Sequence, residues 1–483
     1  MKQRLLAVVS PYLPMYPATV VYMLQNTEYR AGPYLAWYWR TQNFARVAAR
    51  RQLRLTWAAR LLLLALTAGM LLEIAAGLLL IALWYYRGFT GGWAFGLALL
   101  VAYPVVWAHL VVVPLLLGRL CIVKPRENRL IRASEHIFRQ HPGMKIAIAG
   151  SYGKTSMKEL LLQVLGEGKT VAATPANKNV AISHAYFAKA LQGDEDIVLI
   201  EYGEGAPGDV ARFARITHPT HAVITGVAAA HLDRYRTTQA AAEDIFSIAR
   251  FLPDKAHCYV NDESAAAAPF IEPQFQRYGH GGALGWKVTD VQVDISGLSF
   301  VLAKGKRVLR LRSGLLGRHQ LGPLSLAAAL ASESGLSDGQ ITAGIARTKP
   351  FEHRMQPYML GGAWIIDDTY NGNIEGIRAG TALLHELSAR RKLYVTPGLV
   401  DQGAEAAQNH AEMGQLIAAS GADVVVLMQN STTADIRRGL ARAKYGGEVR
   451  VEPRPLDFYT NLAHFVSAGD LVLMQNDWPD NYA

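Results

Sequence analysis

The chain has 483 residues, a formal net charge of +10 and a slightly positive mean hydropathy. Its length corresponds to roughly three domains of about 150 residues each. Much of the positive charge flanks apolar stretches, where it favours anionic lipid, so it gives no indication of a nucleic-acid partner. Its two cysteines, Cys121 and Cys258, cannot build a disulfide framework or a metal cluster, and we expect reduced thiols.

Two long apolar stretches, at residues 61–85 and 93–118, predict a pair of transmembrane helices. Each exceeds the roughly 20 apolar residues that a helix needs to cross a bilayer. A third apolar segment, residues 5–24, is a weaker candidate because three prolines interrupt it. An interfacial or re-entrant segment is the alternative for these residues.

Basic residues predict the orientation of the two helices. They are frequent at residues 40–60 and 119–132, whereas the loop between the two stretches holds only Arg87. We therefore expect a hairpin with both ends in the cytoplasm, and a protein at the cytoplasmic membrane whose later domains face the cytoplasm. Residues 1–118 would supply the transmembrane helices and basic linkers, and residues 119–141 a further linker.

Residues 150–156 carry the clearest chemical signal in the sequence. They read Gly-Ser-Tyr-Gly-Lys-Thr-Ser and lie between an apolar run at residues 145–149 and a helical pattern. A strand, a glycine turn, a Lys-Thr pair and a helix form a cradle for nucleotide phosphates, in which Lys154 reaches the terminal phosphates and the Thr155 hydroxyl binds Mg²⁺. Ile148 stands where the longer Walker pattern has its first glycine. We name as nucleotide-binding residues Gly150, Ser151, Gly153, Lys154, Thr155 and Ser156.

From residue 142 onward, short apolar runs alternate with helical patterns, which predicts a mostly parallel α/β sheet. Residues 284–313 alternate apolar and polar side chains between glycine turns and predict antiparallel hairpins inserted in this unit. The first α/β domain should cover residues 142–349. We expect its strands at residues 197–201, 221–225 and 256–260 and its helices at residues 240–250 and 324–334.

A second α/β domain is expected at residues 350–483, after a boundary near Pro350. Its four expected strands are consistent with a doubly wound, Rossmann-like sheet. They lie at residues 363–366, 393–396, 424–427 and 471–474.

Several polar residues directly follow expected strands, where ligands bind in open α/β sheets. Glu201 ends a strand and offers a carboxylate suited to Mg²⁺. His231 follows another strand, although on its own it fits a buried structural histidine better. Residues 367–373 read Asp-Asp-Thr-Tyr-Asn-Gly-Asn, which an Asx-rich turn explains about equally well. Arg354 offers a planar guanidinium that suits phosphate.

In this combination and order, the motifs resemble those of the Mur ligases, the ATP-dependent amide-forming enzymes of peptidoglycan precursor synthesis. The resemblance covers residues 142–483 and is greatest to the branch that adds D-alanyl-D-alanine to a muramyl tripeptide. It rests on residues 150–156, on Thr174 with Asn177 and Asn179, on residues 201–203, 227–232, 317–319 and 327–329, on Arg354, and on residues 367–373 and 398–410.

The resemblance implies a central P-loop ATPase domain and a C-terminal Rossmann-like domain that closes over it. In this family ATP phosphorylates a carboxylate, and an amine then attacks the acyl phosphate. The implied partners are ATP, Mg²⁺, an amino acid or dipeptide, and a muramyl-peptide-like acceptor. The implied catalytic residues are Lys154, Glu201, His231 and Asp368. The implied Mg²⁺ ligands are Thr155, Glu201 and His231. In addition to the glycine-rich loop, the residues implied to contact ATP are His319, Arg354, Asp368 and Asn371.

The chain departs from the family pattern in three respects. Ala242 replaces a lysine that many members carbamylate, and either Glu243 or Asp244 could substitute as a metal ligand, or the second metal could bind more weakly. Gln320 and Pro323 stand where the family has asparagines near the adenine. Membrane segments replace the N-terminal domain that binds the UDP-sugar in soluble relatives. We therefore hypothesise a membrane-associated acceptor, such as a lipid-linked muramyl peptide.

Two other functions remain open from the sequence. A poly-γ-glutamate or folylpolyglutamate type of ligase shares the same chemistry, but residues 367–373 favour the D-alanyl-D-alanine branch. A membrane scaffold that binds nucleotide without catalysis would fit the missing lysine. The presence of Lys154, Glu201 and His231 favours an enzyme instead.

Overall fold

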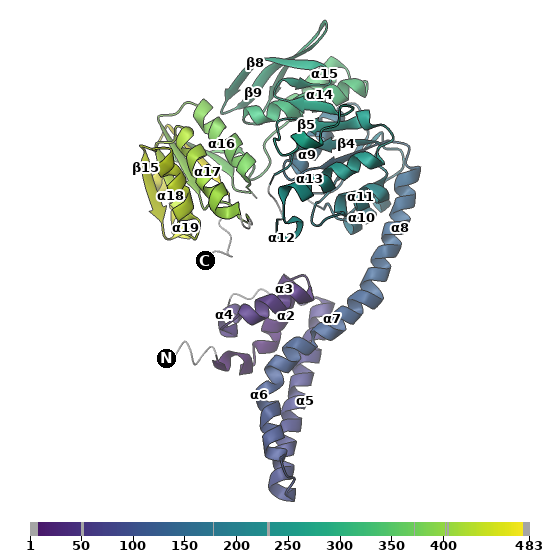
Figure 1. Cartoon of the computed structure of the whole chain (residues 1–483), viewed down its shortest axis with the longest axis vertical. Coiled ribbons are helices and arrows are strands. Elements are labelled where there is room, and N and C mark those ends of the chain that lie inside the picture. The colour runs from purple at the N-terminus through teal and green to yellow at the C-terminus, as the bar shows by residue number, and fades with distance from the viewer. Residues whose placement is uncertain are drawn as a thin grey trace. The chain divides into compact units, whose positions relative to one another are not determined.

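The computed structural model describes residues 8–49, 53–176, 178–228, 232–370, 372–400, 402 and 405–476. The chain divides into two compact units, Met1–Arg129 and Leu130–Ala483 (Figure 1). Each unit has a hydrophobic core of its own.

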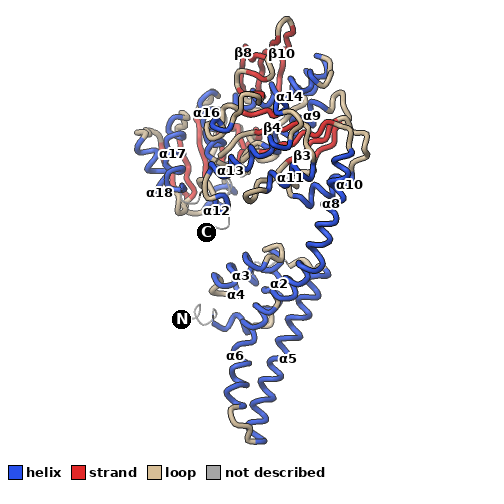
Figure 2. The backbone as a smooth tube through the Cα atoms, turned by 45° about the vertical axis from the view of Figure 1, so that its right-hand side comes forward, coloured by secondary structure: helices blue, strands red, loops and turns tan. Residues whose placement is uncertain are grey.

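The described part of the first unit is helical and is built on a hairpin of two long apolar helices. In both views α5 (Trp57–Arg87) and α6 (Gly92–Leu110) lie side by side (Figures 1 and 2). Helical structure continues after α6 through α7 (Val112–Gly118) and a π-helical turn (Arg119–Val123) into α8 (Lys124–Gln140). Two stretches, Trp57–Arg87 and Gly92–Gln140, are long and apolar enough to cross a membrane.

Glycines let α5 and α6 approach each other closely. A Cβ atom on Gly77 would lie 2.9 Å from the carbonyl oxygen of Gly96, and a Cβ on Gly96 would lie 2.5 Å from that of Gly77. Such contact between helix backbones is typical of helices that associate in a membrane. The α5–α6 pair therefore forms a close-packed hairpin, as the two apolar stretches predicted.

The segment at residues 5–24 forms no spanning helix in its described part. Its α-helix, α2 (Tyr16–Asn26), has 11 residues, about half the length that a bilayer requires. Together with α3 (Ala31–Arg40) and α4 (Phe44–Ala49), it belongs to the core that includes the hairpin. The Tyr16 hydroxyl donates to the carbonyl oxygen of Pro104 in α6 at 3.1 Å. The apolar side chains of α2 at Tyr16, Val20, Val21, Met23 and Leu24 are buried in this core.

In the second unit, the described residues form a ten-stranded and a six-stranded sheet (Figure 2). In the first sheet the strand order is β10-β9-β8-β7-β6-β5-β4-β1-β3-β2, and the strands from β6 to β2 are parallel neighbours. The bounds are β1 (Met144–Ala149), β2 (Val171–Ala173), β3 (Ile197–Glu201), β4 (His221–Ile224), β5 (Cys258–Asn261), β6 (Gln276–Gly279), β7 (Gly282–Ala283), β8 (Trp286–Asp294), β9 (Gly297–Lys304) and β10 (Arg307–Ser313). The predicted hairpins at residues 284–313 extend the edge of this sheet.

Strand β1 shows why the parallel part of the sheet is apolar on both faces. Ile146 and Ile148 belong to a core with α9 and α14, whereas Ala147 and Ala149 belong to a core with α10, α11 and α13. Successive side chains of a strand point to opposite faces, so where helices cover both faces the residues of a strand are apolar on both. The helices are α9 (Lys154–Leu165), α10 (Ala181–Ala190), α11 (Asp209–Thr217), α12 (Leu232–Tyr235), α13 (Thr238–Phe246), α14 (Leu321–Glu333) and α15 (Asp338–Ala346).

The six-stranded sheet has the order β11-β12-β16-β13-β14-β15, and only the β11–β12 pair is antiparallel among its described strands. Its α/β pattern confirms the predicted class. The strands are β11 (Gln356–Leu360), β12 (Ala363–Asp368), β13 (Arg391–Thr396), β14 (Val424–Met428), β15 (Glu448–Glu452) and β16 (Asp470–Gln475), and the helices are α16 (Ile374–Glu386), α17 (Ala406–Ala419), α18 (Thr433–Arg442), α19 (Pro455–Thr460) and α20 (Leu462–Phe465).

Candidate nucleotide and metal site

The glycine-rich loop joins β1 to α9 at the carboxyl edge of the parallel strands. Gly150 has a φ of 142° and Gly153 a φ of 72°, backbone conformations that strain any residue with a side chain. A Cβ atom on Gly150 would also lie 2.2 Å from Oγ1 of Thr225. Helix α9 starts at Lys154, so its free N–H groups border the loop. A helix N-terminus after such a turn forms a site for phosphate.

Glu201 ends β3 beside this loop and is buried, with 1% of its surface exposed. Its Oε1 accepts hydrogen bonds from the Thr155 hydroxyl at 3.1 Å and from Nδ2 of Asn179 at 3.2 Å. His184 Nε2 lies 2.8 Å from the Glu201 carbonyl oxygen, and burial lowers the pKa of His184 to about 4. The neutral ring therefore donates to that carbonyl. The structure thus brings together Thr155 and Glu201, the two described residues that we expected to bind Mg²⁺.

Two lysines from the start of α9 lie within reach of carboxylates near the end of β3. Lys154 Nζ lies 2.9 and 2.8 Å from the two carboxylate oxygens of Glu204. Lys158 is fully buried, and its Nζ lies 3.4 Å from Oε2 of Glu201 and donates to the carbonyl oxygen of Thr174 at 2.8 Å. Each carboxylate thus has a cationic partner, as buried charges require.

The side chains around the loop fit a nucleotide with Mg²⁺. Ser151 Oγ is buried with no hydrogen-bond partner among the described residues, and the buried Glu201 Oε2 has only its ion-pair contact with Lys158 at 3.4 Å. Buried polar atoms of this kind call for a ligand or an ion. The described residues contain no group of three or more His, Cys, Asp and Glu side chains that would hold a metal alone. Mg²⁺ usually completes its coordination with phosphate oxygens and water.

The expected second metal site is only partly described. His231 lies outside the described residues. Ala242 is buried, and Glu243 accepts a hydrogen bond from Gln239 at 3.1 Å. The carboxylate of Asp244 accepts from the N–H of Gly208 at 2.9 Å and from the hydroxyl of Tyr235 at 2.8 Å. Asp244 is therefore already engaged in contacts that join α13 to the turn before α11.

His319 lies just before α14, with its Nε2 at 2.9 Å from Nε2 of Gln320. Desolvation, followed by the nearby His280, lowers the pKa of His319 to about 4. The ring is therefore neutral at physiological pH and can both donate and accept a hydrogen bond.

At the end of β12, the two adjacent carboxylates Asp367 and Asp368 contact residues 353–355, which precede β11. Asp368 accepts hydrogen bonds from the N–H of Met355 at 3.2 Å and from Nε2 of Gln475 at 2.8 Å, and burial raises the pKa of Asp368 to about 6. Asp367 lies 2.8 Å from Nδ1 of His353. The Arg354 guanidinium lies over the ring of Tyr370. Asp368 thus contacts the residue that follows Arg354, and Arg354 packs on the residue two positions after Asp368.

Part of residues 367–373 does form the turn that was the alternative interpretation. Asn373 caps α16 by accepting from the N–H of Gly376 at 3.0 Å, and Asp367 accepts from the N–H of Thr369 at 3.1 Å. Asn371 lies outside the described residues. In the same domain, Nε2 of His410 accepts from the N–H of Leu399 at 2.9 Å, which is a structural contact.

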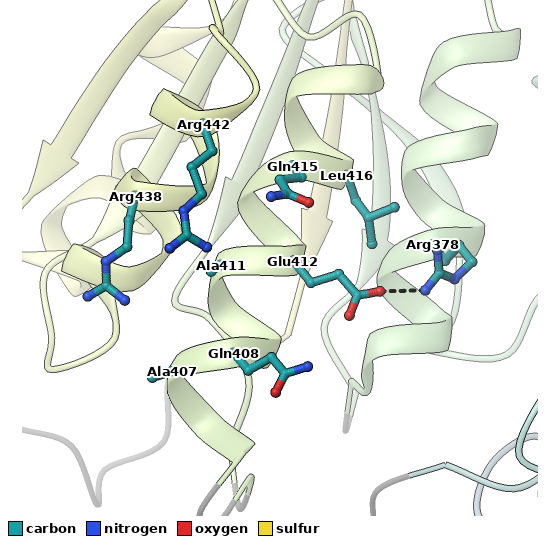
Figure 3. Close-up of a pocket in the computed structure, with 9 residues that line it drawn as sticks. All are labelled: Arg378, Ala407, Gln408, Ala411, Glu412, Gln415, Leu416, Arg438 and Arg442. Carbon is teal, nitrogen blue, oxygen red and sulfur yellow. Dashed lines mark hydrogen bonds and ion pairs between the residues drawn. The ribbon is translucent and has the colours of Figure 1, made fainter.

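A groove of about 610 Å³ crosses α17 and α18 and contains none of the expected site residues (Figure 3). Arg438 and Arg442 line one side. On the other side Arg378 pairs with Glu412 at 2.5 Å.

Lys158 and Glu204 also belong to this site, although the sequence motifs did not indicate them. Lys158 follows Lys154 by one helical turn, a spacing that places two side chains on one helix face. Nothing in the sequence showed that Glu204 would contact Lys154, because these residues lie 50 positions apart.

Comparison with known proteins was consistent with these features. A family model of the Mur ligase middle domain matches residues 148–331, and one described as the Mur ligase, glutamate ligase domain matches residues 353–475. The UDP-N-acetylmuramoyl-tripeptide--D-alanyl-D-alanine ligase of Escherichia coli is 27% identical over 311 residues, which cover 63% of this chain and 69% of that protein. The Treponema pallidum protein of the same name is 30% identical over 290 residues, covering 58% and 61%.

Solved structures agree in fold. MurF from Acinetobacter baumannii has a TM-score of 0.64 at 20% identity, covering 72% of this chain and 77% of that chain. MurF ligase from Thermotoga maritima, solved with ADP, has a TM-score of 0.61 at 20% identity, covering 73% and 80%. The chain spans between 55% and 72% of the length of the curated relatives it matches. Because the two family models together match more than half of the chain, in the expected order, the chain belongs to the Mur ligase family of ATP-dependent, amide-forming ligases.

Proposed function

We propose that this protein is a membrane-tethered ligase that joins an amine to the carboxylate of a muramyl-peptide-like acceptor. The observation that carries the proposal is the glycine-rich loop with the Thr155 hydroxyl 3.1 Å from the buried carboxylate of Glu201. The names of the curated relatives support D-alanyl-D-alanine as the first amine to test. Single amino acids are the other candidates.

In the first step, the γ-phosphoryl group of ATP passes to the acceptor carboxylate, which yields ADP and an acyl phosphate. The amine then attacks the acyl carbon, and phosphate leaves as the amide forms. Lys154 and the N–H groups at the start of α9 would stabilise the negative charge on the transferring group, which is the main requirement of this chemistry. Thr155 and Glu201 would hold Mg²⁺, which withdraws charge from the phosphate oxygens when bound.

Residues of the C-terminal domain would complete the site. Arg354 would contact the phosphates or ribose of ATP, and Asp368 the ribose or the incoming amine. Arg354 lies in the linker that follows the boundary expected near Pro350, and Asp368 accepts a hydrogen bond from Met355 in the same linker. In this linker His353 has a φ of 59° and Met355 a φ of 47°. Linker residues of this kind are suited to absorb a change of angle when a domain closes and excludes water from the acyl phosphate. His319 would contact the base, and His231 and Asn371 are assigned by resemblance alone.

We further propose that the acceptor is associated with the membrane. The family models begin at residue 148, and before them lie two helices apolar enough to span a bilayer. Arginines flank that hairpin on the side expected to face the cytoplasm. A ligase held at the bilayer surface would meet a lipid-linked muramyl peptide without diffusion through the cytoplasm.

Purified full-length protein in lipid nanodiscs tests the proposal. Phosphate release would be measured with D-alanyl-D-alanine and single amino acids, each with a UDP-linked and a lipid-linked muramyl tripeptide. We expect amine-dependent release, faster with the lipid-linked acceptor and lost in Lys154→Ala. Equal or faster turnover of the UDP-linked acceptor would contradict the membrane-associated acceptor. Nucleotide binding without amine-dependent release would favour a non-catalytic scaffold.

A further inference from the structure

The loop lysine is held by a carboxylate that has no place in the reaction described above. The Glu204 side chain is 3% exposed and that of Lys154 is 13% exposed, so their ion pair lies inside the phosphate cradle. The two distances, 2.9 and 2.8 Å, show that both carboxylate oxygens face the same ammonium group. Lys154 also donates to the carbonyl oxygen of Gly150, which fixes its side chain across the loop.

Binding of ATP changes the electrostatics of this pair. If Lys154 turns to the phosphates, Glu204 becomes a buried carboxylate that has lost its partner, which is strongly unfavourable. The phosphates themselves bring further negative charge toward it. If Lys154 stays with Glu204, the phosphates lose much of the attraction of the lysine. A second cation near Glu204 resolves both difficulties.

Glu204 has the properties of a ligand for such a cation. Apart from the ion-pair contact, its Oε2 has no hydrogen-bond partner among the described residues. Glu204 lies three residues after Glu201, on the segment that leaves β3. Glu204 contacts Lys154 and Glu201 contacts Thr155, which are neighbours in the sequence. Both carboxylates therefore border the start of α9. Carboxylate oxygens combined with phosphate oxygens are the ligands that Mg²⁺ prefers.

We propose that Glu204 is a second metal-directed carboxylate of this site. It holds Lys154 while the cradle is empty, and it binds the Mg²⁺ that enters with ATP, either directly or through a coordinated water. Lys154 is thereby released toward the phosphates. The inference rests on the proposed function, because it assumes that the loop binds ATP with Mg²⁺.

The test compares nucleotide affinity with and without the metal. Isothermal titration calorimetry would measure the Kd of a non-hydrolysable ATP analogue for the full-length protein, once in excess Mg²⁺ and once in EDTA. In Glu204→Gln we expect the affinity in EDTA to equal or exceed that of the wild type, because a repelling charge is gone and Lys154 is free. In Mg²⁺ we expect the affinity to fall at least tenfold. The ratio of the affinity in Mg²⁺ to the affinity in EDTA is therefore expected to be lower in Glu204→Gln than in the wild type.

Glu167→Gln is the control, because Glu167 pairs with Arg347 at 2.6 Å in the same domain, in an ion pair that is more exposed than that of Glu204 and Lys154. It should leave both affinities unchanged. Glu204→Asp keeps the charge but shortens the side chain, so it should lose part of the Mg²⁺ effect, and it replaces Glu204→Gln if that variant does not fold. Circular dichroism checks the fold of each variant.

Two results would overturn the inference. If Glu204→Gln tightens binding equally in Mg²⁺ and in EDTA, Glu204 is only the counter-ion of Lys154. If neither affinity changes, the ion pair has no part in nucleotide binding. A wild-type protein that binds no nucleotide under either condition would instead contradict the proposed function.

Discussion

Replacing Lys158 by methionine is the sharpest test of the charge network under the phosphate loop. The lysine is fully buried. Its Nζ donates a hydrogen bond to the carbonyl oxygen of Thr174 at 2.8 Å and lies 3.4 Å from Oε2 of Glu201. Methionine fills much of the same volume but leaves the carboxylate without a cation. Removing one partner of a buried ion pair costs about 3–5 kcal/mol. The lower end applies here because the ion-pair distance is long.

Hydrogen exchange resolved by mass spectrometry measures this loss in the affected domain alone. At about 1.4 kcal/mol per tenfold change, a loss of about 3 kcal/mol corresponds to exchange about 100-fold faster in β1 and β3 where opening is global. The double variant Lys158→Met/Glu201→Gln should recover part of the loss, because the carboxylate no longer needs a cation. A change below about 0.5 kcal/mol for Lys158→Met, typical of an exposed site, would refute the reasoning. Additive effects of the two substitutions would refute the coupling.

Three further predictions concern pH, the loop and the hairpin. Burial lowers the pKa of His184 to about 4, below its unfolded value of about 6.5, so the stability that the neutral ring contributes is present above pH 6.5 and is lost as the pH falls toward 4. In thermal unfolding, the melting temperature of His184→Gln should therefore fall less than that of the wild type over this pH window. The same pH profile in both proteins would contradict this role of His184. Gly150→Ala should cost about 1–3 kcal/mol and weaken ATP binding, because a Cβ atom there is both strained and obstructed. Gly193→Ala, which has a φ of 94° but open space around it, is the control in urea unfolding, and equal losses would show that the obstruction is unimportant. Gly96→Ile should separate α5 from α6, because the new side chain meets the carbonyl oxygen of Gly77. The hairpin should then unfold at a lower concentration of denaturing detergent than in the wild type, and an unchanged unfolding midpoint would contradict this packing.

Local patterns predicted the α/β class and the phosphate loop because their causes are local. The alternation of apolar runs with helical patterns located β3 at residues 197–201, where the structure has it. The two loop glycines adopt positive φ values because the turn from β1 into α9 demands them. Residues 146–149 of β1 are all apolar because helices cover both faces of the sheet there.

The sequence could not predict features that depend on distant contacts. Apolar composition could not distinguish α2, which packs against protein, from a third spanning helix. The Lys154–Glu204 ion pair joins residues 50 positions apart. The contacts of the Asp244 carboxylate with Gly208 and Tyr235 also join separate parts of the chain, and the sequence did not indicate them.

The central claim is that this chain couples ATP cleavage to amide formation. The most direct measurement follows phosphate release and amide product together, by mass spectrometry, in nanodiscs with ATP, Mg²⁺, a lipid-linked muramyl tripeptide and D-alanyl-D-alanine. We predict one amide per phosphate, with neither product formed when the amine or the acceptor is omitted or when Lys154 is replaced by alanine. Phosphate release that does not depend on amine and acceptor, without an amide product, would contradict the claim.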